Sequence, residues 1–488
     1  MILFSLDVPR MLATRHDLVF GLPLLAVAII ASGCVQEPID APKAAMPQSF
    51  FGSRQDKVAA TAMKDWWVPF GDDKLTRLVQ LGAENNAELK QANARVEQAR
   101  AQVGLASSSL LPSISGGGGE ARGDKYGFGT STTKSYGTVS GTWLIDIFGG
   151  ARAQKRAALA KLDSAVADEE DTRINVLTTI ATTYVDLRYY QARIALGRQT
   201  VENRKRSLSL LHDSQGAGQI SQLQIVQGEQ LVAKAEAELP AIEVQLESSL
   251  DSLTSLTGQS VAELRARLLS NGGQPKPKYK IGVGIPADVI RNRPDVQKAE
   301  SSYIAAAEGV GVAKAAFYPS LQLSGFVTPT AVVNSGHVNV WQIAADVSAP
   351  IFDGGKNRAN LAEAKAKLDE ARAAWEASVL KGIAEVEKAL AAYNRDSRNV
   401  AAQEKLVSTS QETLRLGRVS FELGSGEFFN ILDAERDYLE AQQSRTQAIR
   451  DQALHYIALC KAAPADQADK AIIEPIPMRT AGKMPRGS

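Results

Sequence analysis

The feature that most constrains the fold is a pair of long helical patterns, residues 151–214 and 356–423. Residues 151–214 contain no proline. Apolar residues recur in both stretches at mostly three- and four-residue steps, as on one face of a coiled-coil helix. At 1.5 Å per residue, the first stretch alone would make a rod of roughly 95 Å. The sequence therefore predicts an elongated molecule.

The two long patterns belong to two copies of one larger pattern. Three landmarks recur in the same order, at offsets of 207, 204 to 205 and 208 residues. Such near-constant spacing indicates an internal repeat. Each copy is expected to read helix, β-hairpin, long helix, glycine break and helix. The landmark pairs are Leu111-Pro112 and Tyr318-Pro319, Phe148-Gly149-Gly150 and Phe352-Asp353-Gly354-Gly355, and Gly216-Ala217-Gly218 and Gly424-Ser425-Gly426.

This repeat divides the chain into six parts. Shorter helices are expected at about 73–110, 219–257, 287–316 and 428–462, where alanine is abundant. The expected parts are a signal peptide (1–33), an N-terminal segment (34–72), a first repeat (73–257, hairpin 112–148), a linker (258–286), a second repeat (287–462, hairpin 319–352) and a tail (463–488).

The hairpins carry alternating polar and apolar residues. Strands are expected at 113–121, 136–147, 321–328 and 340–351. Strands of about eight to twelve residues with one apolar face match a membrane-spanning barrel, although a soluble sandwich sheet is the alternative. Four strands cannot close a barrel, so the barrel interpretation requires two, three or four copies. The polar face, which would line a water-filled lumen, carries Thr142, Asp146, Gln342 and Asp346.

The N-terminus is typical of an export signal. Arg10 and Arg15 precede a 14-residue apolar run from Leu18 to Ala31, which is too short to span a bilayer. Ala31-Ser32-Gly33 then leads directly into Cys34 and resembles a bacterial lipobox. Lipidation of Cys34 would tether the protein to a bilayer. An ordinary signal that leaves Cys34 free is the alternative.

Composition excludes several function classes. Lys and Arg total 55 against 54 Asp and Glu, so a net charge of +1 argues against nucleic-acid binding. The four histidines lie far apart, and two cysteines cannot build a disulfide framework or a Cys-rich zinc site. No nucleophile–base pair or carboxylate dyad stands out. We therefore expect neither an enzyme nor a metal or cofactor site.

The two glycine breaks predict the tips of helical hairpins. Tips from several copies could close a tube, and acidic residues at such a constriction would favour cations. Asp433 is the candidate, with an ordinary solvated helix residue as the alternative. The tip residues are Gly216, Gly218 and Ser221 in the first copy and Phe421, Gly424, Gly426, Phe429, Asn430 and Asp433 in the second.

Several motifs in order carry a family resemblance from about Trp66 to Ala462. They are Trp66-Trp67-x3-Gly71-Asp72-x2-Leu75, Asn93–Arg100, Glu238-Leu239-Pro240 with Glu243, Ile285–Val296 with Ala299-Glu300, Pro350–Gly355 and Leu432–Arg436. The chain resembles the TolC-like outer-membrane factor family, and within it the lipoprotein branch of RND-type efflux systems (NodT-type outer-membrane efflux lipoproteins).

The resemblance implies an α+β membrane protein. Three chains would form a 12-stranded outer-membrane β-barrel, four strands per chain, continuous with a long periplasmic α-helical barrel. Residues 258–286 would belong to an equatorial belt. Asp433 and Phe429 would lie at a periplasmic gate. Asn430 and Gln224 would also lie at this gate, where some family members have aspartate in place of Asn430 and often have it in place of Gln224, so the resemblance implies a less acidic aperture than usual.

The resemblance also implies function and partners. The expected function is passive conduction of small molecules from an inner-membrane RND-type pump and a periplasmic adaptor to the exterior. The adaptor would contact the tips, and the protein would be a homotrimer in outer-membrane lipid, with no nucleic acid and no cofactor. A type I protein secretion duct and a lipid-anchored periplasmic coiled-coil scaffold are the alternatives.

Overall fold

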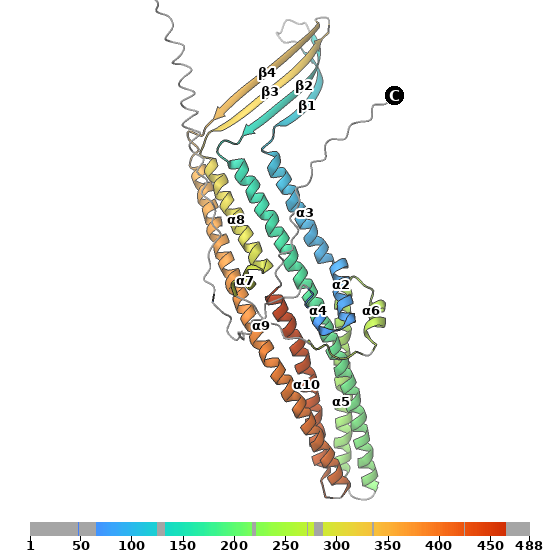
Figure 1. Ribbon diagram of the computed structural model, residues 1–488. Helices are drawn as coiled ribbons and strands as arrows, with labels where there is room; N and C mark the ends of the chain where they lie inside the picture. The colour runs from blue at the N-terminus through green and yellow to red at the C-terminus, as the bar shows by residue number, and fades with distance from the viewer. Residues whose placement is uncertain are drawn as a thin grey trace, which may run out of the picture.

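The computed structural model describes residues 47, 65–123, 132–216, 221–270, 272–277, 286–333, 336–423 and 425–464. Cys34, Gly218 and Gly424 lie outside the described residues, as do the signal peptide and most of the segments 34–72 and 463–488. Figure 1 shows an elongated molecule with the strands at one end and the helical tips at the other.

Two long helices run the length of the helical part (Figure 1). They are α4 (Gly150–Gly216) and α9 (Lys356–Glu422), each of 67 residues. At 1.5 Å per residue each measures roughly 100 Å. Their bounds lie within two residues of the predicted ones, so the predicted rods are confirmed.

Shorter helices lie beside the long ones. The first repeat contains α2 (Asp73–Asn85), α3 (Ala87–Ser108) and α5 (Gln222–Thr257). The second contains α7 (Pro286–Arg291), α8 (Pro294–Ala315) and α10 (Phe428–Ala462). The 3-10 turn η2 (Val68–Phe70) precedes α2.

Two local features differ from the expected helices. The predicted helix 73–110 is divided at Asn86, because its side chain accepts hydrogen bonds from the backbone N–H groups of Glu88 and Leu89 and starts a new helix. The linker also contains α6 (Val261–Leu268), which begins at the capping residue Ser260 and its partner Glu263.

Polar side chains close the joints where shorter helices meet end to end. The Asn86 amide donates to the carbonyl oxygen of Leu256 at 3.0 Å and joins the start of α3 to the end of α5. The Arg293 guanidinium donates to the carbonyl oxygen of Ala462 at 2.9 Å and joins the start of α8 to the end of α10. The two repeats thus have equivalent joints, each beside an unbroken long helix.

The largest apolar core surrounds the first joint. It includes Leu75, Ile180, Leu250, Leu264 and Tyr456 among its buried residues, from α2, α4, α5, α6 and α10. The core therefore fixes the relative positions of both repeats.

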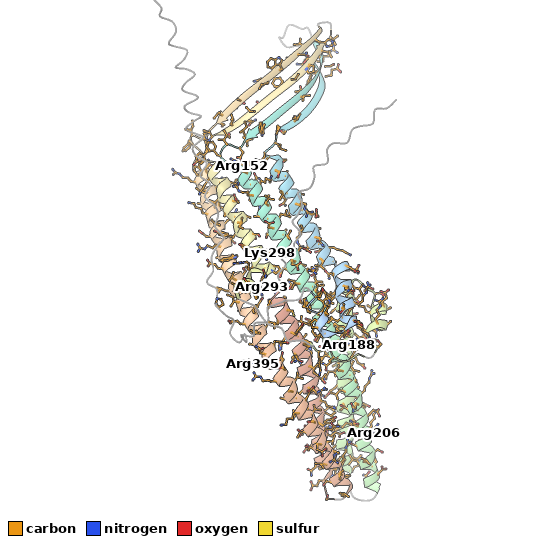
Figure 2. All side chains as sticks on the ribbon, viewed as in Figure 1. Arg152, Arg188, Arg206, Arg293, Lys298 and Arg395 are labelled. Atoms are coloured by element: carbon orange, nitrogen blue, oxygen red, sulfur yellow. The ribbon has the colours of Figure 1, made fainter. Side chains whose placement is uncertain are left out.

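A buried arginine fastens the linker to this core. The Arg188 side chain in α4 is 1% exposed, and Figure 2 places it beside α2 and α6. Its guanidinium donates to the Tyr184 hydroxyl at 2.8 Å and to the carbonyl oxygen of Leu268 at 3.1 Å. Tyr184 in turn donates to the Asp72 carboxylate at 2.6 Å. Buried polar groups need such partners, so this network specifies where the end of α6 lies.

The four strands form one antiparallel sheet in the order β1-β2-β3-β4. They are β1 (Ser113–Gly123), β2 (Thr132–Ile145), β3 (Ser320–Val332) and β4 (Gly336–Ser348). The prediction of four strands per chain is confirmed, with strand ends shifted by a few residues. Within the described chain, β1 and β4 are the edges of the sheet.

Among the residues that the structure describes, no helix has both the length and the apolar character required to cross a membrane.

Candidate functional site

The strand register sorts the sheet into two chemically different faces. Residues that pair across strands point to the same face. The pairs Gly116–Val139, Val139–Val327 and Val327–Trp341 form one row of the first face, and three further rows follow toward the helices. The apolar members of this face are Ile114, Val139, Trp143, Ile145, Leu321, Leu323, Val327, Trp341, Ile343, Ala345 and Val347.

This apolar face is exposed in the isolated chain. Ile343, near the middle of the rows, is 81% exposed, and Trp341 beside it is 68% exposed. Monomeric soluble proteins rarely leave a contiguous apolar surface of this kind uncovered. The face therefore requires an apolar environment outside the chain.

The opposite face is largely polar. Its hydroxyl groups hydrogen-bond between strands: Ser115 with Ser140 at 2.8 Å, and Thr138 with Thr328 at 2.9 Å. Asp346 pairs in register with Gln322 on this face. Such a surface is compatible with water, which agrees with the alternation read from the sequence.

Asp146 requires a correction. It was predicted to lie on the polar strand face, but β2 ends at Ile145. The Asp146 carboxylate accepts hydrogen bonds from the backbone N–H groups of Ala151 and Arg152, at 3.1 and 2.8 Å, and from the Arg152 side chain. Unpaired N–H groups at a helix start attract an acceptor, so the Asp146 carboxylate caps the first turn of α4 and the residue does not continue the strand.

The two hairpins α4–α5 and α9–α10 meet at their tips. One buried apolar cluster there contains residues from all four helices. The rings of Phe421 and Phe428 pack edge to face, with their centroids 5.7 Å apart. Because both tips share this core, they form one surface per chain. The cluster consists of Leu211, Ile225, Leu414, Phe428, Ile431 and Ala434.

The predicted tip residues take distinct local roles. Gly216 ends α4 and Ser221 precedes α5. The Gln224 side chain accepts a hydrogen bond from the Ser221 backbone N–H at 2.8 Å, which caps α5. In the second tip, the N–H groups of Ser425 and Gly426 both donate to the Ser420 carbonyl oxygen, at 3.0 and 3.1 Å. Both turns are thus stabilised by local hydrogen bonds.

The candidate gate residues lie exposed at the start of α10. The Asp433 side chain is 67% exposed, and its carboxylate pairs with Arg436 at 3.2 Å on the same helix. Phe429 is 45% exposed although the neighbouring Phe428 is buried. Asn430 is exposed as well. These side chains are available to a neighbouring molecule, and their assignment to a gate stays a prediction.

Sequence reasoning missed the most buried charge at the tips. Glu435 is 1% exposed, and its carboxylate lies 3.1 Å from the Arg204 guanidinium of α4 and 3.6 Å from that of Arg418 of α9. Only its place in the Leu432–Arg436 motif hinted at a role. The pairing with Arg204 joins residues more than two hundred positions apart, which no local pattern reveals.

A second charged centre lies at the joint between α8 and α10. The Arg293 guanidinium contacts the Asp295 carboxylate at 2.8 Å and the Glu385 carboxylate at 2.6 Å (labelled in Figure 2). Burial alone would lower the pKa of Arg293, but the hydrogen bonds and charges of the two carboxylates outweigh it and raise the pKa. Arg293 therefore stays charged and holds three helices together.

In the parts of the chain that the structure describes, no group of three or more metal-ligating side chains converges. The site features of the molecule are accordingly a two-faced sheet at one end and a paired helical tip at the other.

Comparison with known proteins gives a consistent result. The family model described as "Outer membrane efflux protein" matches residues 78–259 and 285–463. Nodulation protein T of Rhizobium leguminosarum bv. trifolii is 33% identical over 445 residues, which cover 88% of this chain and 94% of that protein.

Two solved structures are similar over most of their length. The outer-membrane channel OprN is 26% identical, with a TM-score of 0.77 over 87% of this chain and 99% of that one. The open state of the MtrE outer membrane channel of Neisseria gonorrhoeae is 25% identical, with a TM-score of 0.78 over 88% of this chain and 97% of that one.

Proposed function

This chain belongs to the outer membrane efflux protein family, and on that premise we propose how its parts form a gated transport path. The protein is an outer-membrane channel of a tripartite efflux pump in a Gram-negative bacterium, and it extends into the periplasm. The family is one of channels rather than enzymes. Channels of this family form trimers and work with other pump components.

The two-faced sheet is the observation that supports a path through the membrane. Three copies of the sheet, joined β4 to β1, would close without a free edge, as strands in lipid require. The exposed apolar face around Trp341 and Ile343 would then contact lipid. The polar face, with Thr142, Gln342 and Asp346, would line a water-filled lumen. In a periplasmic scaffold this apolar face would be exposed to water, which is unfavourable.

We propose that the tips form the periplasmic gate and that a periplasmic adaptor contacts them. The two tips, one near Gly216 and Ser221 and the other near Gly426, form one surface per chain, and the ends of α4, α5, α9 and α10 that carry it lie farthest from the sheet (Figure 1). An adaptor bound there would couple an inner-membrane RND-type pump to the opening of this gate. The cargo would be small molecules, which need no specific pocket in a passive duct.

Replacing Asp433 with alanine is expected to raise ion conductance severalfold. In a trimer the exposed Asp433 carboxylates would surround the axis, where they could bind a cation that holds the tips together. The measurement is single-channel conductance of the detergent-extracted oligomer in a planar bilayer. Asp437→Ala is the matched control, because Asp437 shares the partner Arg436 at 3.1 Å. Equal conductance in the two variants would contradict the gate assignment.

We also propose that Cys34 carries the lipid anchor, which its lipobox-like context supports. Cys34→Ser is expected to abolish incorporation of radiolabelled palmitate in growing cells, because serine offers no thiol for thioether formation. Cys460→Ser is the control, since the Cys460 thiol is buried in α10. Full labelling of the Cys34→Ser protein would place the anchor elsewhere.

A further inference from the structure

The two connectors that lead from a strand to a long helix are alike in sequence but differ in exposure. Phe148 follows β2 and Phe352 follows β4, at an offset of 204 residues. A glycine with positive φ comes after each phenylalanine, Gly149 at 79° and Gly354 at 64°, so both connectors turn in a way that favours glycine. Phe148 is partly buried, whereas Phe352 is 91% exposed. Within one chain, the second connector therefore lacks a cover that the first one has.

The cover of Phe148 comes from the other repeat. Its ring stacks on the Tyr318 ring, with centroids 4.7 Å apart and an interplanar angle of 15°. Tyr318 lies two residues before β3, and β3 pairs with β2. The stacked pair thus lies at the foot of the boundary between the two repeats, where α4 also packs on α8.

The equivalent of Tyr318 in the first repeat is Leu111, at an offset of 207 residues and again two residues before its strand. Leu111 is 65% exposed. It lies at the edge of the sheet opposite Phe352, because β1 and β4 are the two edge strands of the described sheet (Figure 1). A second copy with its β1 beside β4 would bring the two side chains together. Head-to-tail interfaces of this kind can close into a ring.

The strand register extends the same equivalence into the sheet. Trp143 of β2 pairs with Leu323 of β3 in one chain. The same offsets, 204 upward and 207 downward, convert this pair into Val347 of β4 and Gly116 of β1. Both converted positions lie on the apolar face, as do Trp143 and Leu323. The two faces would therefore continue from one copy to the next, whereas a slip of one residue would exchange them.

We propose that Phe352 of one protomer packs on Leu111 of the next, and that Val347 pairs with Gly116 across the same seam, the boundary between β4 and the β1 of the neighbouring copy. The inference rests on the proposed joining of three copies, β4 to β1, and specifies the side chains and the register that join them. Phe352 and Leu111 then cover each other between chains, as Phe148 and Tyr318 do within a chain.

Disulfide trapping tests the contact in the full-length oligomer. Phe352→Cys with Leu111→Cys, in a Cys460→Ser background, should give a covalent trimer on oxidation with copper phenanthroline, because each seam closes with one bond. Neither single variant should do so. Co-expressed chains that carry only one of the two cysteines each should give covalent dimers, which shows that the bond joins different chains.

The first connector provides the matched control. Phe148→Cys with Tyr318→Cys should form its bond within one chain, so the protein should lose its free thiols and still run as a monomer on a denaturing, non-reducing gel.

A second cysteine pair tests the register. Val347→Cys should cross-link to Gly116→Cys about tenfold faster than to Ile114→Cys or Gly118→Cys, because a shift of two residues along a strand carries the thiols beyond disulfide reach. Faster cross-linking to either neighbouring position would overturn the proposed register.

Alanine variants give a measurement that does not depend on cysteine chemistry. Phe352→Ala and Leu111→Ala should each lower the temperature at which the oligomer dissociates. The double variant should lower it by less than the sum of the two shifts, because both changes remove one contact. Additive shifts would overturn the contact.

The readouts separate this inference from the proposed function. A wild-type protein that forms neither an oligomer nor a conducting channel would contradict the channel assignment. A conducting oligomer in which the Phe148→Cys and Tyr318→Cys thiols are oxidised, while those of Phe352→Cys and Leu111→Cys stay reduced, would contradict the seam contact alone.

Discussion

Replacing Ile343 with arginine is expected to prevent stable assembly in the outer membrane. Ile343 lies near the middle of the apolar sheet face and is 81% exposed in the isolated chain. An arginine at the bilayer midplane of a β-sheet costs about 2 to 4 kcal/mol, and a trimer would carry three of them. The measurement is the fraction of heat-dissociable oligomer in outer-membrane preparations, which should fall below detection.

The adjacent residue provides a matched control. Gln342 precedes Ile343 on the same strand, and its register partner Phe326 lies on the opposite, largely polar face. Gln342→Arg should therefore assemble close to wild type, because its charge would face water. If both variants assembled equally well, or if Gln342→Arg were the worse, the assignment of the two faces would be wrong.

Replacing Arg293 with alanine is expected to destabilise the joint between α8 and α10 by about 3 to 5 kcal/mol. The change leaves the carbonyl oxygen of Ala462 without its donor at 2.9 Å, and it leaves Asp295 and Glu385 without their shared guanidinium. Because Glu385 is partly exposed, water offsets part of the loss. The measurement is the temperature at which the purified oligomer dissociates, with hydrogen exchange near 294–300 and 455–462.

Two further variants define what Arg293 contributes. Arg293→Lys keeps the charge but loses the planar fork that contacts two carboxylates and a carbonyl, so its effect should be intermediate. Arg372→Ala removes an exposed ion pair with Glu376 on α9 and should cost about 0 to 1 kcal/mol. An Arg293→Ala protein as stable as Arg372→Ala would show that apolar packing alone maintains the joint.

The sequence predicted the features that depend on local periodicity. The three- and four-residue steps of residues 151–214 reflect a helix whose apolar residues lie on one side, and α4 follows them closely. The alternation around Trp143 and Trp341 likewise gave the correct partition of residues between faces. These patterns are visible because neighbours in sequence produce them.

Features that depend on distant partners could not be predicted. Asp146 fits the alternation of β2, but the free N–H groups at the start of α4 compete for its carboxylate. Arg188 occurs in a charged helical stretch, yet it is buried, and its guanidinium donates to the carbonyl oxygen of Leu268. Glu435 differs from its exposed neighbours only because Arg204 lies opposite it. In each case the partner is brought close by the fold.

The joints between the shorter helices have a mechanical consequence. Among the described residues, the long helices α4 and α9 pass this level without a break, whereas the shorter helices beside them meet end to end through side chains such as Asn86 and Arg293. A pull or bend applied at the tips therefore reaches the sheet chiefly along two continuous hydrogen-bonded helices.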